Sequence, residues 1–353
     1  MPLICSLMVG LHGHKNTSIY SKGLIMGIDE NIAVGHGCNS KHIDQELSNA
    51  RSVYRDAYTT IHNLMATIKK GKKPDFKIVE PVIEKAITSL EQNSDALVSL
   101  CLNKDSDDYI FKHPTSTCII AARFSQFLGH SADETKDIAI GALLGDIGKV
   151  FIPSKILYKP GKLTDAEYNT IKKHSSYSSK YIEKFGNFSE LAFKAVSEHH
   201  ERIDGTGYPH NLSGDQISVA GQVTAIADTY DAMTSVRMHQ TRKEPTETLK
   251  FMLSKKDELF SETMIKQFIQ CLGLYPSGTL VALNNGFIGV VLEQSKTSFM
   301  QPIVRLVYDL KKKRTIRPFS DVDIGNDVAQ SGLKVISDVS KSKFSFQVLS
   351  AIG

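Results

Sequence analysis

Residues 199–209 read His-His-Glu-Arg-Ile-Asp-Gly-Thr-Gly-Tyr-Pro, and this stretch decides the fold that we expect. The two histidines follow residues 189–197, where apolar side chains recur at helical spacing. Gly205 and Gly207 can take positive φ angles, so a tight loop is predicted directly after the helix. Paired imidazoles that face such a loop suit a metal ion beside a small-ligand site.

The composition is that of an ordinary globular protein. The 353-residue chain has room for two or three domains, and it is 41% apolar and 23% charged. A net charge of +4 implies no strong attraction to nucleic acid or to a membrane surface. No signal-peptide pattern and no apolar run of about 18 residues are found, so a cytoplasmic protein without a membrane span is predicted. The five cysteines lack paired spacing and are expected to be reduced.

Helical periodicity dominates the chain and predicts a mainly α fold. Apolar residues recur three or four apart over residues 42–70, 78–90, 94–102, 109–128, 132–144, 189–197, 219–235 and 246–271. Thr164 and Glu167 form a capping-box pattern that opens a further helix towards His174. Residues 152–162 contain two prolines and a glycine and are predicted to be a loop. Short polar connections favour a compact helical bundle.

The two ends of the chain differ from this helical middle. Residues 1–40 mix β-branched residues with glycines and predict a small N-terminal lobe, and 41–104 form a helical linker region. The histidines of the N-terminal lobe, His12, His14 and His36, could form a metal cluster or lie in solvated loops. Beyond a boundary near 275, residues 279–292 predict a hairpin around Asn-Asn-Gly, and 302–308 a further strand before a Lys/Arg turn at 311–314. Residues 276–353 are therefore expected to form a small β-rich C-terminal lobe.

The middle of the chain carries imidazoles and carboxylates on or beside predicted helices. These candidate metal ligands are His113, Asp146, His174, His199, His200 and Asp228. Such donors suit borderline divalent metals such as Fe, Mn, Ni or Zn. Asp146 has two oxygens and could bridge two ions, which together can hold a phosphate for in-line attack. Any one histidine alone is more often a core or surface residue, so the set matters only if the fold gathers it in one place.

Several segments in the same order resemble one family. These are Ala-Leu-Leu-Gly-Asp-Ile-Gly-Lys (142–149), Ile-Pro (152–153), Lys-Pro-Gly-Lys-Leu-Thr (159–164), residues 199–209, and Ala-Ile-Ala-Asp-Thr-Tyr-Asp-Ala-Met-Thr-Ser (225–235). They closely resemble the HD-GYP family of cyclic di-GMP phosphodiesterases, within the HD phosphohydrolase superfamily. The resemblance implies an all-helical catalytic domain over 105–275. It also implies two or three metal ions and hydrolysis of cyclic di-GMP, a bacterial second messenger, to pGpG and GMP.

The resemblance also assigns roles to residues by position. The six candidate ligands match the family's metal ligands, and Asp146 and Lys149 are expected to be catalytic, with Lys149 beside the scissile phosphate. The residues expected to bind substrate are Gly207, Tyr208, Asp231 and Arg237. Other roles remain open: Lys149 could end a helix, Tyr208 could pack the loop, and Asp231 could orient a ligand histidine. Arg202 and Asp204 are expected to form a salt link that shapes the loop.

The sequence departs from the family at three places. Gly145 stands where the family has the histidine of its His-Asp pair, so one ion keeps at most His113, Asp146 and Asp228. That loss should weaken metal binding or activity by at least about 10- to 100-fold. Tyr109 replaces a glutamate that serves a third metal in some members, which argues against a three-metal site. In the segment Arg237-Met238-His239-Gln240, Gln240 replaces a cation for which Arg242 or Lys243 could compensate.

Three hypotheses follow. The first is a cyclic di-GMP phosphodiesterase with an impaired site and two divalent ions (Fe, Mn or a similar metal), one of them weakly bound. The second is a degenerate member that binds cyclic di-GMP or a partner signalling protein without turnover. The third is a phosphohydrolase that acts on another nucleotide, against which the Gly-Tyr-Pro loop argues. The helices at 42–102 could pack on the catalytic domain, which we favour, or form a homodimer interface.

Overall fold

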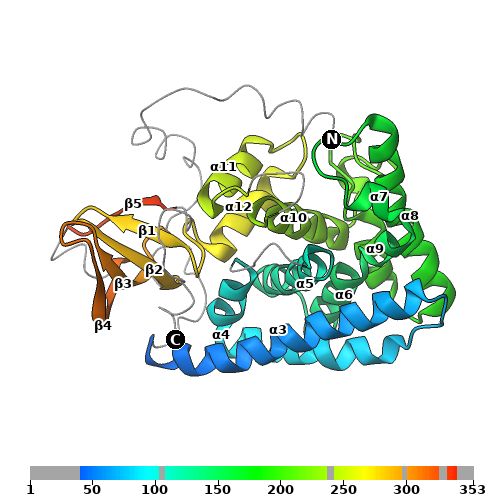
Figure 1. The fold of residues 1–353 in the computed structure, drawn as a ribbon. Helices are drawn as coiled ribbons and strands as arrows, with labels where there is room; N and C mark the ends of the chain where they lie inside the picture. The colour runs from blue at the N-terminus through cyan, green and yellow to red at the C-terminus, as the bar shows by residue number, and fades with distance from the viewer. Residues whose placement is uncertain (1–39, 103–107, 237–241, 296–299, 326–331, 340–353) are drawn as a thin grey trace.

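The computed structural model describes residues 40–102, 108–236, 242–295, 300–325 and 332–339. In this part of the chain a helical body carries a five-stranded sheet at one end, and helices α7 and α8 lie at the opposite end (Figure 1). The predicted N-terminal lobe, with His12, His14 and His36, and the segment Arg237-Met238-His239-Gln240 lie outside the described residues. None of the described helices is both long enough and apolar enough to cross a bilayer.

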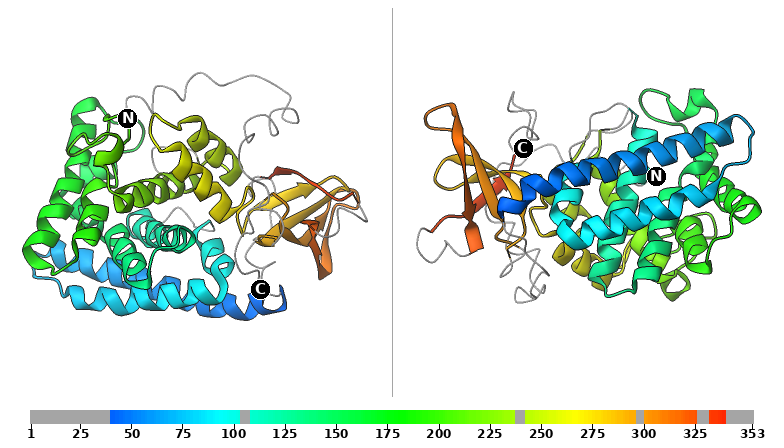
Figure 2. Two further views of the ribbon diagram at one scale, coloured as in Figure 1. Left: turned by 180° about the vertical axis from the view of Figure 1, so that it is seen from behind. Right: turned by 90° about the horizontal axis from the view of Figure 1, so that it is seen from below.

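Two long helices, α3 (Ser40–Lys69) and α4 (Val79–Cys101), lie side by side along one side of the molecule (Figure 2). A short 3-10 helix, η2 (Phe76–Ile78), precedes α4. The two helices predicted over 78–90 and 94–102 are both present within α4, and the non-helical backbone of Asn93 (φ −155°, ψ 94°) separates them. The Asn93 side chain accepts a hydrogen bond from the Ala96 amide at 3.0 Å, so the helix restarts at once. Both α3 and α4 also pack on α5, as the intramolecular alternative predicts.

The body's centre is a group of four helices. They are α5 (Tyr109–Phe127), α6 (Ala132–Leu144), α9 (Glu190–Glu198) and α10 (Val219–Thr234), in agreement with the predicted ranges. α5 packs against α6 and α10, and α9 packs against the same two helices. The α6–α9 contact is close, since a Cβ at Gly141 would lie 2.4 Å from the Cβ of Ala195. This packing brings the end of α9 next to the end of α6.

Helix α8 (Asp165–Phe185) begins at the predicted capping box. The Glu167 carboxylate accepts from the Thr164 amide at 2.8 Å, and the Thr164 hydroxyl accepts from the Glu167 amide at 3.3 Å. Before it, the predicted loop holds only the short α7 (Ser154–Leu157), which follows the 3-10 helix η3 (Ile147–Phe151). The Ser178 hydroxyl donates to the Gly145 carbonyl at 2.6 Å and accepts from the Gly148 amide at 2.8 Å. α8 is thereby joined to the turn that carries Asp146.

The single helix predicted over 246–271 is wrong. The structure has two helices, α11 (Pro245–Ser254) and α12 (Glu262–Leu272), separated by a turn in which Asp257 has a φ of 60°. The Glu258 carbonyl in this turn accepts a hydrogen bond from the Asp204 amide at 3.1 Å. The break therefore supports the loop after the paired histidines, a contact that local periodicity does not reveal. A 3-10 helix, η4 (Gly214–Gln216), follows that loop.

The C-terminal sheet is antiparallel throughout, in the order β4-β3-β2-β1-β5. Its strands are β1 (Leu280–Leu283), β2 (Phe287–Glu293), β3 (Ile303–Asp309), β4 (Arg314–Asp323) and β5 (Val335–Asp338). The predicted hairpin is confirmed, with Gly286 at a φ of +91° in its turn, and so is the lysine-rich turn between β3 and β4. The small β-rich lobe is thus present, while the domain boundaries at 40, 104 and 275 stay predictions.

Candidate metal centre

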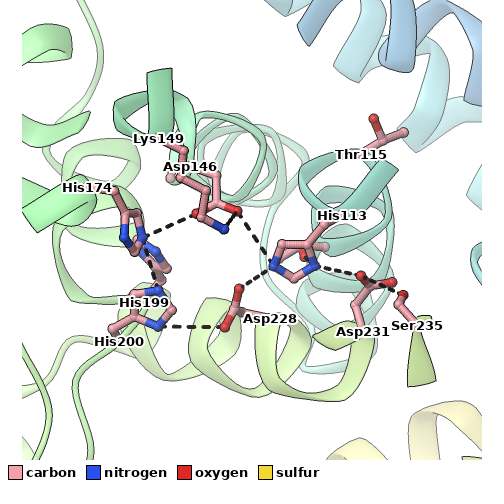
Figure 3. Close-up of polar contacts among 12 residues, drawn as sticks. His113, Thr115, Asp146, Lys149, His174, His199, His200, Asp228, Asp231 and Ser235 are labelled. Carbon is pink, nitrogen blue, oxygen red and sulfur yellow. Dashed lines mark hydrogen bonds and ion pairs between the residues drawn. The ribbon is translucent and has the colours of Figure 1, made fainter. Parts of the chain in front are cut away.

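The six predicted ligands come from five helices or their ends, and their side chains converge in one place (Figure 3). They lie on α5 (His113), directly after α6 (Asp146), on α8 (His174), at the end of α9 (His199 and His200) and on α10 (Asp228). Each of the six residues is largely buried. The helical packing described above therefore gathers side chains that are up to 115 positions apart in the sequence.

Four of these residues form a compact cluster. One potential ligand atom from each of Asp146, His174, His199 and His200 lies within 4.8 Å of the others. His174 Nδ1 donates to the Ile171 carbonyl and His199 Nδ1 to the Val196 carbonyl, both at 2.7 Å. Because a carbonyl only accepts, each Nδ1 carries a proton, and each neutral ring keeps its lone pair on Nε2. The backbone thus fixes the tautomer that coordinates a metal.

The cluster also leaves polar atoms without protein partners. His199 Nε2 is buried and has no hydrogen-bond partner among the described residues. Asp146 Oδ1 likewise has no hydrogen bond there, and it lies 3.2 Å from His174 Nε2 (Figure 3). His200 Nε2 and His174 Nε2 face each other at 3.1 Å. A buried lone pair without a partner is unfavourable, and a divalent cation among these atoms would satisfy all of them. Asp146, His174, His199 and His200 fit a metal ion on this ground.

Electrostatics keep the donors in their coordinating forms. Burial lowers the pKa of His199 to about 4, although the Asp228 charge opposes the shift. Burial and the neighbouring His199 hold the pKa of His200 well below its usual range. Burial alone would raise the pKa of Asp146, but Lys149 and two imidazoles outweigh it and hold that pKa well below the usual range. Near pH 7, His199 and His200 therefore offer neutral imidazoles, and Asp146 offers an ionised carboxylate.

His113 and Asp228 lie beside the cluster and contact each other. His113 Nε2 is 2.8 Å from Asp228 Oδ1 and 3.6 Å from Asp146 Oδ2, while Asp228 Oδ2 is 3.7 Å from His200 Nδ1. Burial acts to raise the pKa of Asp228, but His200 and His113 outweigh it and lower that pKa. His113 also stacks on Tyr109, at 5.0 Å between ring centroids. The six residues thus divide into a four-residue cluster and an adjacent His-Asp pair.

Asp231 and Lys149 each contact a residue of the predicted ligand set. Asp231, predicted to bind substrate, is fully buried with Oδ2 at 2.6 Å from His113 Nδ1. This contact favours the alternative in which Asp231 orients a ligand histidine. Lys149 Nζ is 2.5 Å from Asp146 Oδ2, so its charge lies at the cluster.

Gly145 lies next to the cluster. Its backbone is helical (φ −52°, ψ −34°), and a Cβ there would be 3.4 Å from both Nδ1 and Cε1 of His199. That is an ordinary contact distance, so the position has room for a Cβ atom beside the imidazole cluster. The glycine is not required by the backbone, in contrast to Gly148, where a Cβ would lie 2.1 Å from the His174 carbonyl oxygen.

The loop after the histidines packs on itself and on His200. The Tyr208 ring lies 4.6 Å from the His200 ring, and burial raises the Tyr208 pKa well above its usual value. A Cβ at Gly207 would come 2.4 Å from the Arg202 amide nitrogen, so only glycine fits there. Glu201, which sequence reasoning missed, is buried and accepts hydrogen bonds from the amides of His210 (2.7 Å) and Leu212 (3.0 Å). No periodic signal distinguishes such a loop carboxylate from an exposed one.

The expected salt link between Arg202 and Asp204 is wrong. Arg202 donates to the carbonyls of His199 (3.3 Å) and Glu201 (2.7 Å), and Asp204 accepts from the Thr206 amide at 2.9 Å. Carbonyls that converge at the end of α9 offer the guanidinium several acceptors at once. Arg237 lies outside the described residues, so its role stays a prediction. Of the two compensating cations considered, Lys243 forms an ion pair with Glu247.

Comparison with known proteins agrees with this geometry. The HD domain family matches residues 99–263. A cyclic di-GMP phosphodiesterase of Pseudomonas aeruginosa is 31% identical over 283 residues, which cover 80% of this chain and 68% of that protein. The chain belongs to the HD-GYP family. A second relative, a cyclic di-GMP phosphodiesterase of Thermotoga maritima, is 26% identical over 260 residues, which cover 73% of this chain and 69% of that protein.

A solved structure supports the fold. Bd1817, an HDG"Y"P protein from Bdellovibrio bacteriovorus, superimposes with a TM-score of 0.53 at 16% identity, over 63% of this chain and 71% of its own. The predicted all-helical HD-type domain is confirmed by this likeness and by the helices α5 to α12.

Proposed function

We propose that this HD-GYP protein is a metal-dependent phosphodiesterase that hydrolyses cyclic di-GMP to pGpG and GMP, with an impaired site. The observation that carries the proposal is the set of buried imidazole Nε2 atoms and the Asp146 carboxylate directed at one place. Its relatives in Pseudomonas aeruginosa and Thermotoga maritima are named cyclic di-GMP phosphodiesterases. A cytoplasmic location and cyclic di-GMP as the main partner belong to this proposal.

The metal ions are assigned to the two parts of the ligand set. Asp146, His174, His199 and His200 would hold one ion, and their mixed nitrogen and oxygen donors suit Fe or Mn. His113, Asp146 and Asp228 would hold the second more weakly, because Gly145 contributes no imidazole. Divalent ions at this place would supply Lewis acidity towards a phosphate and lower the pKa of water.

The chain's own residues perform the remaining tasks. Lys149, at 2.5 Å from Asp146, brings a positive charge to the place where a phosphate would meet the cluster. Tyr208 covers the His200 ring and excludes water from one side of it. Gly207 and the buried Glu201 hold the loop that would line the nucleotide pocket.

A second candidate function is binding of cyclic di-GMP, or of a partner protein, without turnover. Gly145 favours it, and so does the engagement of both His113 nitrogens by carboxylates, which leaves neither nitrogen for an ion without rearrangement. A homodimer or other signalling partners would fit either function.

Metal content and product formation distinguish the two candidates. The protein is purified with added Mn or Fe, metal per chain is quantified, and cyclic di-GMP is followed by chromatography. The phosphodiesterase proposal expects about one tightly held ion per chain and the appearance of pGpG. Metal content near zero with no product, but with retained nucleotide binding, would favour the binding protein.

A further inference from the structure

Lys172 on α8 is held by two tyrosine rings at the edge of the candidate metal centre. Its Nζ lies 5.2 Å from the centroid of the Tyr168 ring and 5.8 Å from that of Tyr208. Tyr168 and Lys172 are four residues apart and so lie on one face of the helix. An ammonium near the faces of two phenol rings is attracted by both, which fixes where its charge lies.

The positive charge of Lys172 has no acidic partner in the described part of the chain. No carboxylate there lies within 4 Å of its Nζ, although the side chain is half-buried. Two other lysines of the same region are paired, Lys149 with Asp146 and Lys159 with Glu167. Lys172 is therefore available to an anion that comes from outside.

Lys172 also lies at a definite place relative to the metal ligands. The Tyr208 ring that it approaches is 4.6 Å from the His200 ring and 6.3 Å from the His174 ring. Lys172 is thus separated from the ligand histidines by one aromatic ring, whereas Lys149 contacts the ligand Asp146 directly. Among the described residues, Lys149 is thus a cation at the metal ligands and Lys172 a cation farther out.

We propose that Lys172 binds the second phosphate of cyclic di-GMP, the one that is not cleaved in the first step. This inference rests on the proposed function. A cyclic dinucleotide carries two phosphates joined in one ring, so a phosphate at the metal ligands and Lys149 places the other at a distance. A lysine ammonium on a flexible stem suits such a phosphate as a point charge.

The test compares Lys172→Met with Lys173→Met, a matched control that removes the same charge from the next, exposed residue of α8. The probes are cyclic di-GMP and bis(p-nitrophenyl) phosphate, which has a single phosphate. For Lys172→Met we expect the KM for cyclic di-GMP to rise by about tenfold. Metal content, kcat and hydrolysis of the single-phosphate probe should match those of the wild type. Lys172→Arg should restore most of the affinity, and Lys173→Met should change none of these quantities.

Each contrary result has its own meaning. An unchanged KM in Lys172→Met, or an unchanged dissociation constant by equilibrium dialysis if turnover is absent, overturns the role of Lys172 and leaves the proposed function intact. A parallel loss of metal and of single-phosphate hydrolysis also overturns it, because Lys172 would then only support Tyr208 and His200. A wild-type protein that neither binds nor hydrolyses cyclic di-GMP removes the proposed function and this inference together.

Discussion

Asp231 Oδ2 lies 2.6 Å from His113 Nδ1, and the opposite ring nitrogen, Nε2, faces Asp228 at 2.8 Å. Asp231 is fully buried, and the Ser235 hydroxyl donates to its Oδ2 at 3.4 Å. A carboxylate at Nδ1 fixes the direction of the ring, so that Nε2 faces Asp228 and the metal centre. We therefore propose that Asp231 positions His113.

Replacing Asp231 tests that positioning role. Asp231→Ala leaves His113 Nδ1 without its acceptor and should lower kcat by about 10- to 100-fold, with the KM for cyclic di-GMP little changed. Asp231→Asn retains an acceptor oxygen and should recover part of the loss. Steady-state kinetics of both variants measure the split. A raised KM with normal kcat would instead support the substrate-binding role predicted from the sequence.

Gly145→His should repair the impaired half of the site. The new Cβ meets the His199 ring at 3.4 Å, so the backbone at this position admits a Cβ without a clash. A restored imidazole should raise both metal content and kcat/KM, the latter by about tenfold or more. Gly145→Ala is the matched control, because it adds the Cβ without a ligand and should raise neither. If Gly145→His leaves both quantities flat, the missing ligand is not the defect.

The metal-free protein should lose stability in mildly acidic solution through His199. The folded-state pKa of about 4 lies below the ordinary 6.5, so between these values the unfolded chain binds a proton that the folded chain does not. Stability should therefore fall by about 3 kcal/mol as the pH falls from 6.5 to 4. Denaturant unfolding of wild type and His199→Gln, both treated with chelator, checks this. Equal pH slopes for the two proteins would contradict the prediction.

Glu201→Gln should destabilise the loop and the fold. The buried carboxylate accepts hydrogen bonds from the amides of His210 and Leu212, and a glutamine would place an NH₂ group against one of them. Loss of one such charge-assisted bond should lower the free energy of unfolding by about 1.5–3 kcal/mol. The exposed Glu183→Gln is the control and should be neutral. A Glu201→Gln protein with wild-type stability would show that the loop is held by other contacts.

Local sequence was sufficient for most elements of the fold. Hydrophobic periodicity predicted the central helices to within a few residues, and the Thr164–Glu167 capping box and the turn at Gly286 placed two element ends. Hydrophobic periodicity failed over 246–271, where it predicted one helix instead of two. The turn between α11 and α12 is stabilised by the Asp204–Glu258 contact with a distant loop, which local sequence does not reveal. The order of the motifs likewise identified the HD-GYP family, and position 145 showed the absent imidazole, since both can be read from the sequence without the tertiary structure.

What only the tertiary structure decided is how those positions act on each other. The sequence nominated six ligands, but only packing of α5, α6, α8, α9 and α10 separates the cluster around His199 from the His113–Asp228 pair. The lone pairs on His174 and His199 Nε2 depend on backbone carbonyls one turn earlier, and the pKa of His199 depends on its burial. The placement of Lys172 between two tyrosines is also a through-space fact. Residue identity determines which groups can coordinate or carry charge, whereas distance and burial determine which of them do.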